Sequence, residues 1–199
     1  MVKIKICGLK RLEDIEIVNR YKPDYIGFVF ADSKRKVSHE LSYELKQSLD
    51  SDIVSVGVFV DSSPEEIIKL FNEGIIEMAQ LHGNESEDYI LDLKEKTNGE
   101  LKIIKAIEMN ESVDLEIFNS SNADYLLLDS GKGSGKTFDW SLIKKDLKKD
   151  FFLAGGLDSS NVSQAIEEFG PYAVDLSSSL EVNGFKDEIK IKEIMEVIN

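Results

Sequence analysis

The 199-residue sequence predicts an α/β fold, a single-domain (β/α)8 barrel with eight parallel strands that spans residues 1–199. Short β-rich runs alternate with segments of helical spacing along the whole chain, and this alternation indicates a parallel sheet. Eight repeats of the strand and helix unit are the number that a closed barrel requires. An open doubly wound sheet is the alternative. No linker rich in Pro, Gly or Ser divides the chain, so one domain is expected.

Each predicted strand is a short run of mainly apolar residues, with β-branched and aromatic side chains prominent among them. Buried parallel strands have this composition because helices cover their outer face. In chain order the predicted strands are 3–7, 25–30, 53–60, 76–81, 101–107, 124–129, 151–155 and 172–177.

The segments between the strands carry apolar residues at helical spacing. Segment 63–74 has the clearest boundary signals, because Ser63 can cap a helix, Pro64 suits its first position and Gly74 can end it. Comparable patterns predict helices at 12–21, 158–170 and 186–199.

Composition excludes several classes of function. The formal charge of −14 argues against a nucleic-acid partner, because binding a phosphate backbone requires a basic face. The opening 14 residues lack a secretory signal and no apolar run approaches the roughly 20 residues of a membrane span, so we expect a cytoplasmic protein with no membrane partner. Cys7 is the only cysteine, which excludes an intrachain disulfide and a cysteine-rich metal site.

Chemistry-bearing residues gather just past the predicted strands. In a (β/α)8 barrel the loops after the strands build the site, whereas the opposite rim here offers mostly surface Asp, Lys and Asn. We therefore expect one functional face, formed by Cys7, Gly8, Asp32, Ser33, Arg35, Asp61, Gln80, His82, Glu108, Asp129, Gly155, Gly156, Ser177, Ser178 and Ser179.

The stretch "SGKGSGKT" at 130–137 resembles a nucleotide-binding loop but departs from it. That motif needs Gly, four residues and then Gly-Lys-Ser/Thr, and here Ser130 stands at the first position. We interpret the stretch as a glycine-rich lid that follows Asp129. A carboxyl group at a strand end under such a lid is suited to general-acid work, although an aspartate there can also simply cap a turn.

Cys7 is the second candidate catalytic group. Lys5 lies on the same side of the predicted strand, because strand side chains alternate between faces. A nearby cation lowers the pKa of a thiol from its ordinary value of about 8.5, so Lys5 is expected to favour a thiolate at Cys7. The alternative is that Cys7 is an inert packing residue.

Anion-binding groups follow three of the strands, and a histidine follows a fourth. Gly155 and Gly156 follow the seventh strand and Ser178 and Ser179 follow the eighth, where barrels often hold a phosphate. The guanidinium of Arg35, after the second strand, suits a carboxylate. His82, after the fourth, is a weak signal on its own.

Taken together, these motifs resemble phosphoribosylanthranilate isomerase, an enzyme family of tryptophan biosynthesis. The resemblance rests on "KICGL", "GFVF" with "SKR", "VGVFV", "QLHG", "LLLD" with "GSGKTFDW", "LAGGL" and "VDLSSSLE", which occur in order along nearly the whole chain. It implies an Amadori rearrangement of N-(5-phosphoribosyl)anthranilate without metal or cofactor. The expected partner is thus a phosphorylated small molecule, and the expected assembly is a monomer or a homodimer.

The resemblance also implies roles for individual residues. Cys7 is similar to the family's general base and Asp129 to its general acid, so we expect surroundings that keep Asp129 protonated and Cys7 deprotonated. Arg35 would hold the anthranilate carboxylate, and His82 would also contact the substrate. The backbone N–H groups of Gly155, Gly156, Ser178 and Ser179 would hold the phosphate.

Two departures and two alternatives remain at this stage. Ser179 replaces a glycine that is common in the family, which predicts strain if that backbone needs a positive φ. The loop after Asp129 also looks short, which puts the reach of the lid in question. The alternatives are the related isomerase of histidine biosynthesis, for which we expect Asp at position 7 and two similar halves, and a non-catalytic barrel that binds a phosphometabolite.

Overall fold

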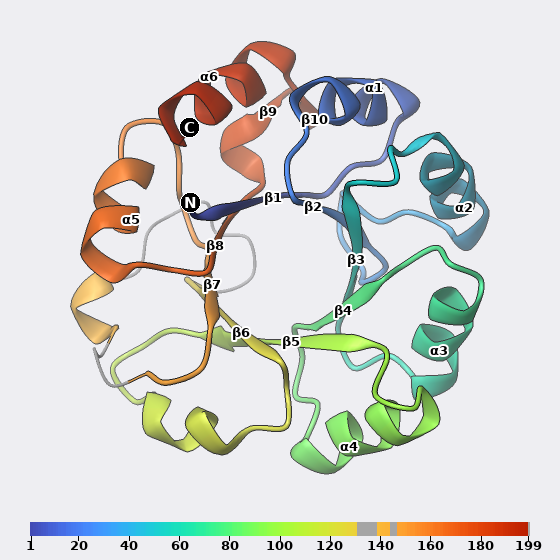
Figure 1. Cartoon of the computed structure of the whole chain (residues 1–199), viewed down its shortest axis with the longest axis vertical. Coiled ribbons are helices and arrows are strands. Elements are labelled where there is room, and N and C mark those ends of the chain that lie inside the picture. Colours follow the sequence, from blue (N-terminus) through green and yellow to red (C-terminus); the bar gives the residue numbers. More distant parts are fainter. Residues whose placement is uncertain (131–138, 144–146, 199) are drawn as a thin grey trace.

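The computed structural model describes residues 1–130, 139–143 and 147–198, and its eight parallel strands close into one barrel (Figure 1). β8 pairs in parallel with β1, so the closed barrel is confirmed and the open sheet is wrong. The strands are β1 (Lys3–Cys7), β2 (Tyr25–Val29), β3 (Val54–Phe59), β4 (Met78–Leu81), β5 (Lys102–Glu108), β6 (Tyr125–Asp129), β7 (Phe151–Leu153) and β8 (Ala173–Leu176).

Helices surround the barrel in Figure 1. The α-helices are α1 (Leu12–Tyr21), α2 (His39–Ser48), α3 (Pro64–Asn72), α4 (Glu87–Lys96), α5 (Val162–Phe169) and α6 (Glu188–Ile198). The described parts of the crossovers after β5 and β6 contain short 3-10 helices instead, at η1 (Leu115–Ser120) and η2 (Trp140–Leu142). In the crossover after β5, all of which is described, the 3-10 helix takes the place of the α-helix of the unit.

The composition of the crossover after β5 explains its departure. Residues 109–124 are rich in Asn, Ser and Asp, whose side chains compete with a helix by bonding to nearby backbone groups. Asp114 does so, because its carboxylate accepts from the backbone N–H of Glu116 at 3.2 Å. A short 3-10 helix tolerates such local bonds better than a long α-helix.

Serine caps set the beginning of three helices. Ser63 accepts a backbone hydrogen bond at the start of α3, Pro64 occupies its first position, and Gly74 follows its end with φ at 70°, as predicted. Ser38 and Ser86 cap α2 and α4 in the same way. Across the described residues, no helix combines the length and apolar character needed to cross a membrane.

An aromatic plug of Tyr25, Tyr125, Phe152 and Tyr172 fills the barrel at the amino ends of the strands. The Phe152 ring lies 5.4, 5.6 and 5.7 Å from the rings of Tyr25, Tyr125 and Tyr172, measured between centroids. The Tyr25 and Tyr172 hydroxyls are 2.9 Å apart. The plug closes this end of the barrel, so an internal cavity can open only toward the other end.

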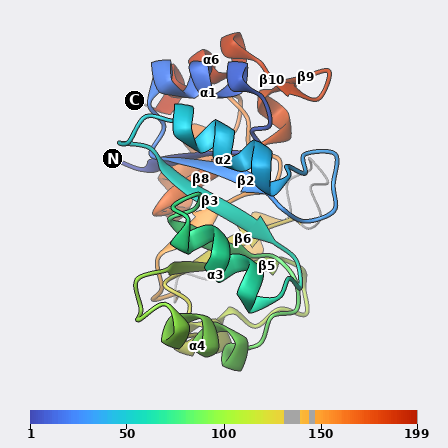
Figure 2. The ribbon, with the colours of Figure 1, turned by 90° about the vertical axis from the view of Figure 1, so that its right-hand side faces the viewer.

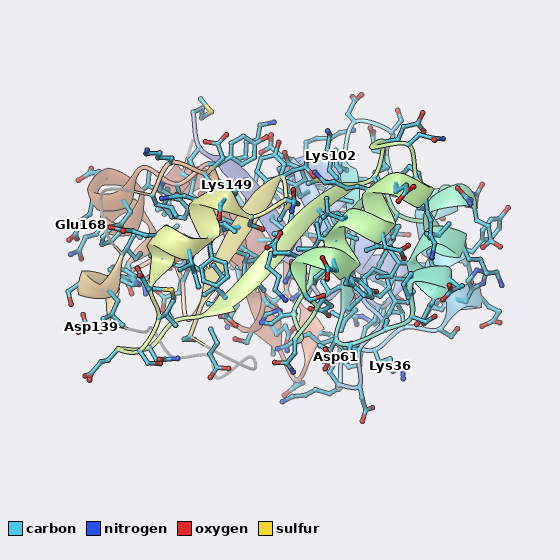
Figure 3. The ribbon with its side chains drawn as sticks, turned by 90° about the horizontal axis from the view of Figure 1, so that it is seen from below. Lys36, Asp61, Lys102, Asp139, Lys149 and Glu168 are labelled. Carbon is cyan, nitrogen blue, oxygen red and sulfur yellow. The ribbon has the colours of Figure 1, made fainter. Side chains whose placement is uncertain are left out.

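The two ends of the barrel carry different connections. In Figure 3, Lys36, Asp61 and Asp139, which follow strands, lie at one end, and Lys102 and Lys149, at or before strand starts, lie at the other. Figure 2 shows that the loop after β2 and the hairpin of β9 (Glu181–Val182) and β10 (Phe185–Lys186) extend at the end away from the marked termini. The loops that follow the strands thus share one end, as expected.

The plug makes a measurable contribution to stability. We expect Phe152→Ala to lower the free energy of unfolding by about 3 to 5 kcal/mol, because it empties a fully buried aromatic site. Urea unfolding followed by circular dichroism measures this change. Tyr43→Ala, at a side chain that is half exposed on α2, is the matched control. Equal losses in the two variants would contradict the role of the plug.

Candidate active site

A cavity of about 520 Å³ opens at the carboxyl ends of the strands. Of the fifteen residues expected on the functional face, all except Gly8, Asp61 and Glu108 are among the residues that line it, and these include the eight for which the resemblance implied a role. Those eight are Cys7, Arg35, His82, Asp129, Gly155, Gly156, Ser178 and Ser179. Gln80, which was expected on this face without a specific role, also lines the cavity, as does Asp175, which was not among the expected residues.

Cys7 ends β1 and is held by close packing. Its thiol is buried, and a Cβ at Gly27 on the neighbouring strand would lie only 2.6 Å from its Sγ. Glycine at this position of β2 therefore leaves the space that the thiol occupies. The Ser177 hydroxyl donates to the Cys7 carbonyl oxygen at 3.0 Å, which ties the end of β1 to the loop after β8.

Lys5 lies two residues before Cys7 and faces the same interior. Its side chain is completely buried, and its Nζ donates to Asp175 Oδ2 at 2.8 Å. Burial alone would lower the pKa of Lys5, but the charges of Asp175 and Cys7 more than offset this, and the pKa is raised. Lys5 is therefore a fixed cation next to the thiol.

Lys5 favours the thiolate as expected, but the expected net result, a Cys7 thiol with a lowered pKa, is wrong. Burial raises the pKa of the Cys7 thiol, and the opposing effect of Lys5 is smaller than this desolvation. Asp175 adds to the rise because its negative charge also disfavours the thiolate. The substrate-free site therefore favours the protonated thiol.

Asp129 ends β6 and is nearly fully buried, with 6% of its surface exposed. His82 Nε2 lies 3.4 Å from Asp129 Oδ2, and the other ring nitrogen, Nδ1, lies 3.1 Å from Gln80 Nε2. His82 thus connects Asp129 to a buried amide on β4. Of the lid predicted at 130–137, only Ser130 is among the described residues. The predictions about the reach of the lid and about its resemblance to a nucleotide-binding loop therefore lie outside them.

The loop after β7 has the backbone geometry of an anion cradle. Gly155 and Gly156 have φ values of 84° and 67°, which side chains disfavour. A Cβ at Gly155 would also lie 2.8 Å from the backbone nitrogen of Ser130. Glycine at position 155 therefore lets the loop after β7 pack directly against Ser130 at the end of β6.

Ser179 is not strained. It lies in η3 (Ser178–Leu180), and it is absent from the described non-glycine residues with positive φ, so the strain predicted for this departure from the family is wrong. A 3-10 helix needs only negative φ, which serine adopts freely. Ser179 adds a hydroxyl where glycine would have none.

Arg35 is paired with a carboxylate of the chain itself. Its Nε and Nη2 donate to the two oxygens of Glu181 at 2.7 and 3.0 Å. Lys186 Nζ donates to Glu181 Oε1 at 2.9 Å. Burial would raise the pKa of Glu181, but Arg35 and Lys186 outweigh it and lower the pKa to about 2. Arg35 is therefore presented in a geometry that suits a carboxylate.

Sequence reasoning missed the partners Glu181 and Lys186 and the ion pair of Lys5 with Asp175. One signal was available: Asp175 is a charged residue inside an otherwise apolar strand of a predicted barrel. A charge at such a position needs a buried partner. The sequence does not say which residue supplies it.

Four buried polar atoms among the described residues have no hydrogen-bond partner and belong to residues that line the cavity. They are Gln80 Oε1, His82 Nε2, Asp175 Oδ1 and Ser179 Oγ. Buried polar atoms are normally paired, so a cluster of unpaired ones indicates that a polar ligand completes the site. Within the same described residues, no three His, Cys, Asp or Glu side chains are grouped to hold a metal ion.

The fold and this cavity define an enzyme of the (β/α)8-barrel class that binds a polar small molecule at the carboxyl ends of its strands. The family model described as N-(5'phosphoribosyl)anthranilate (PRA) isomerase matches residues 4–197. The chain belongs to this family, and the family predicted from the sequence is confirmed.

Relatives and solved structures agree with this assignment. N-(5'-phosphoribosyl)anthranilate isomerase of Endomicrobium trichonymphae is 43% identical over 203 residues, covering 100% of this chain and 98% of its own. The crystal structure of phosphoribosyl anthranilate isomerase from Thermus thermophilus has a TM-score of 0.90 at 30% identity, covering 99% and 98% of the two chains.

A second solved structure bears a ligand. It is a phosphoribosyl anthranilate isomerase in complex with reduced 1-(o-carboxyphenylamino)-1-deoxyribulose 5-phosphate. Its TM-score is 0.86 at 34% identity, and the match covers 98% of this chain and 97% of that chain. The present chain is accordingly an isomerase of the tryptophan-biosynthesis family, and the histidine-pathway alternative is set aside.

The burial of Cys7 predicts a pH dependence. Because burial raises the pKa of this thiol, we expect its thiolate to form only above the ordinary midpoint of about 8.5 in the substrate-free protein. The ultraviolet absorbance of the thiolate, followed during a pH titration, measures this midpoint. Cys7→Ser supplies the blank, because the chain has no second cysteine. A midpoint at or below the ordinary value would contradict the dominance of burial.

Proposed function

We propose that this chain, as one catalytic domain over residues 1–199, converts N-(5-phosphoribosyl)anthranilate to 1-(2-carboxyphenylamino)-1-deoxyribulose 5-phosphate. The supporting observation is that Cys7 and Asp129 line one cavity from β1 and β6. These strands are three places apart around the closed barrel, through β8 and β7. An acid and a base so placed reach a pentose between them from different sides.

The reaction moves one proton at each end of the sugar. Asp129 donates a proton to the ring oxygen as the bond between that oxygen and C1 breaks, which leaves a protonated imine on the anthranilate nitrogen. The Cys7 thiolate then removes the proton from C2, and the electron pair of that bond forms the enolamine. Transfer of the C2 hydroxyl proton and protonation at C1 give the ketone, with no change in overall composition.

In this mechanism Cys7 and Asp129 together carry one proton when the reaction starts. The reactive form has the proton on Asp129 and the charge on Cys7, whereas burial favours a protonated Cys7 in the free protein. Lys5 favours the reactive form, because its raised pKa keeps a positive charge beside the thiol. The positive charge of the protonated imine acts in the same direction once the ring has opened.

The two ends of the substrate have distinct anchors in this proposal. Gly155, Gly156, Ser178 and Ser179 hold the phosphate by backbone N–H groups, because two glycine positions leave the peptide groups open. The Ser179 hydroxyl is an additional donor, since its Oγ is buried without a partner among the described residues. Arg35 holds the anthranilate carboxylate, which replaces Glu181 as the partner of the guanidinium group.

The remaining assignments stay predictions. His82 was expected to contact the substrate, and its position against Asp129 supports a role at the acid end of the cavity. A phosphorylated small molecule is the proposed partner, without metal, cofactor, nucleic acid or membrane. The expected assembly is a monomer or a homodimer in the cytoplasm.

The activity is tested by forming phosphoribosylanthranilate in situ and following its fluorescence as the enzyme consumes it. We expect Cys7→Ala and Asp129→Ala each to lower kcat by about 10²- to 10⁴-fold, the usual contribution of a general acid or base. Asp52→Ala, at an exposed carboxylate far along the chain from the site residues, is the control. Wild-type turnover in either site variant would overturn the role of that residue.

The carboxylate anchor is tested separately. We expect Arg35→Lys to raise KM about tenfold with little change in kcat, because one ammonium cannot replace a two-point guanidinium contact made in both ground and transition states. Steady-state kinetics with the same substrate measure this. Arg20→Lys changes an exposed arginine paired with Glu188 and serves as the control. An unchanged KM would place the anthranilate ring elsewhere in the cavity.

A further inference from the structure

Gln80 has a buried amide, and its contact with His82 bears on which nitrogen of the imidazole ring carries the proton. It lies on β4 with 2% of its surface exposed, and its Nε2 is 3.1 Å from His82 Nδ1. With the amide oriented as it is here, Gln80 Nε2 can only donate, and this orientation pairs it with an Nδ1 that accepts. The ring proton of neutral His82 is then on Nε2.

That proton faces the carboxyl group assigned to acid catalysis. His82 Nε2 lies 3.4 Å from Asp129 Oδ2, so Gln80, His82 and Asp129 form a line from the β4 amide to the end of β6. Asp175 is the other charged group that interacts electrostatically with both His82 and Asp129.

The ring tautomer decides what Asp129 can do. With the proton on Nε2, that nitrogen is a donor 3.4 Å from Oδ2, a separation that must shorten for a hydrogen bond to form, and the other carboxyl oxygen is left to carry the acidic proton. With the proton on Nδ1, the Nε2 lone pair would face Asp129 and compete with the sugar for that proton. Only the first arrangement leaves the acid available to the substrate.

We propose that Gln80 is a positioning residue for the general acid: it fixes His82 in the Nε2-protonated tautomer, and His82 in turn orients Asp129. This inference rests on the acid role of Asp129 in the proposed function. The amide acts through the imidazole and needs no contact of its own with the substrate. Groups that orient a functional imidazole are commonly worth about 10- to 100-fold in activity.

The tautomer is read directly from long-range ¹⁵N–¹H correlation spectra of the substrate-free protein. The chain has two histidines, and His39 is partly exposed beside Glu73, so His39→Gln assigns both rings. We expect a protonated Nε2 and an unprotonated Nδ1 at His82. A protonated Nδ1, alone or together with a protonated Nε2, would overturn the proposal.

Gln80→Glu reverses the hydrogen bond with almost no change of shape, because a carboxylate accepts from Nδ1–H. We expect the His82 tautomer to switch and kcat to fall about 10- to 100-fold while KM stays within about threefold. Gln47→Glu makes the same replacement at an exposed site on α2 and is the matched control. If Gln80→Glu does not fold, Gln80→Met removes the donor without adding charge, and mixed tautomers with a smaller loss of kcat are expected.

The kinetic outcomes separate the two proposals. A wild-type protein that does not consume phosphoribosylanthranilate would end the proposed function and this inference with it. An active wild type with an equally active Gln80→Glu variant would end only the role of Gln80. A variant that raises KM at unchanged kcat would likewise overturn that role, since it would place the amide in substrate binding.

Discussion

The buried ion pair of Lys5 and Asp175 is the interaction on which both the fold and the site depend. The two residues are register partners on β1 and β8, the strands that close the barrel. Desolvating two charges costs as much as their attraction returns, so such a pair is poor evidence of stability. Its value here is positional: it joins the first strand to the last and keeps a cation beside Cys7.

The fold and the location of the site could be predicted because both follow from local patterns. Strand and helix periodicity set the barrel, and the barrel brings all strand ends to one rim, so Cys7 and Asp129 had to share it. Partners across the chain could not be predicted in this way. Lys5 and Asp175 are 170 residues apart and Arg35 and Glu181 are 146 apart, and nothing in the neighbouring sequence specifies either pairing.

The errors have two physical origins. The charge state of Cys7 was predicted from its neighbour Lys5, but desolvation depends on the complete packing around the thiol, including the space left by Gly27. The strain predicted at Ser179 assumed a positive φ, whereas η3 places this residue in a conformation open to any side chain. In both cases the residue type was known and its three-dimensional surroundings decided the outcome.

The reaction requires Cys7 without its proton and Asp129 with one, so the surroundings of each group decide how much of the protein is in the reactive form. A fixed cation at Lys5 favours the thiolate, but burial and Asp175 oppose it, so the free protein favours a protonated thiol at Cys7. The positive charge that develops at the imine nitrogen once the ring has opened favours the thiolate in the step that removes the C2 proton. The site is thus most reactive when occupied, and a nucleophilic thiolate is not exposed to solvent between turnovers.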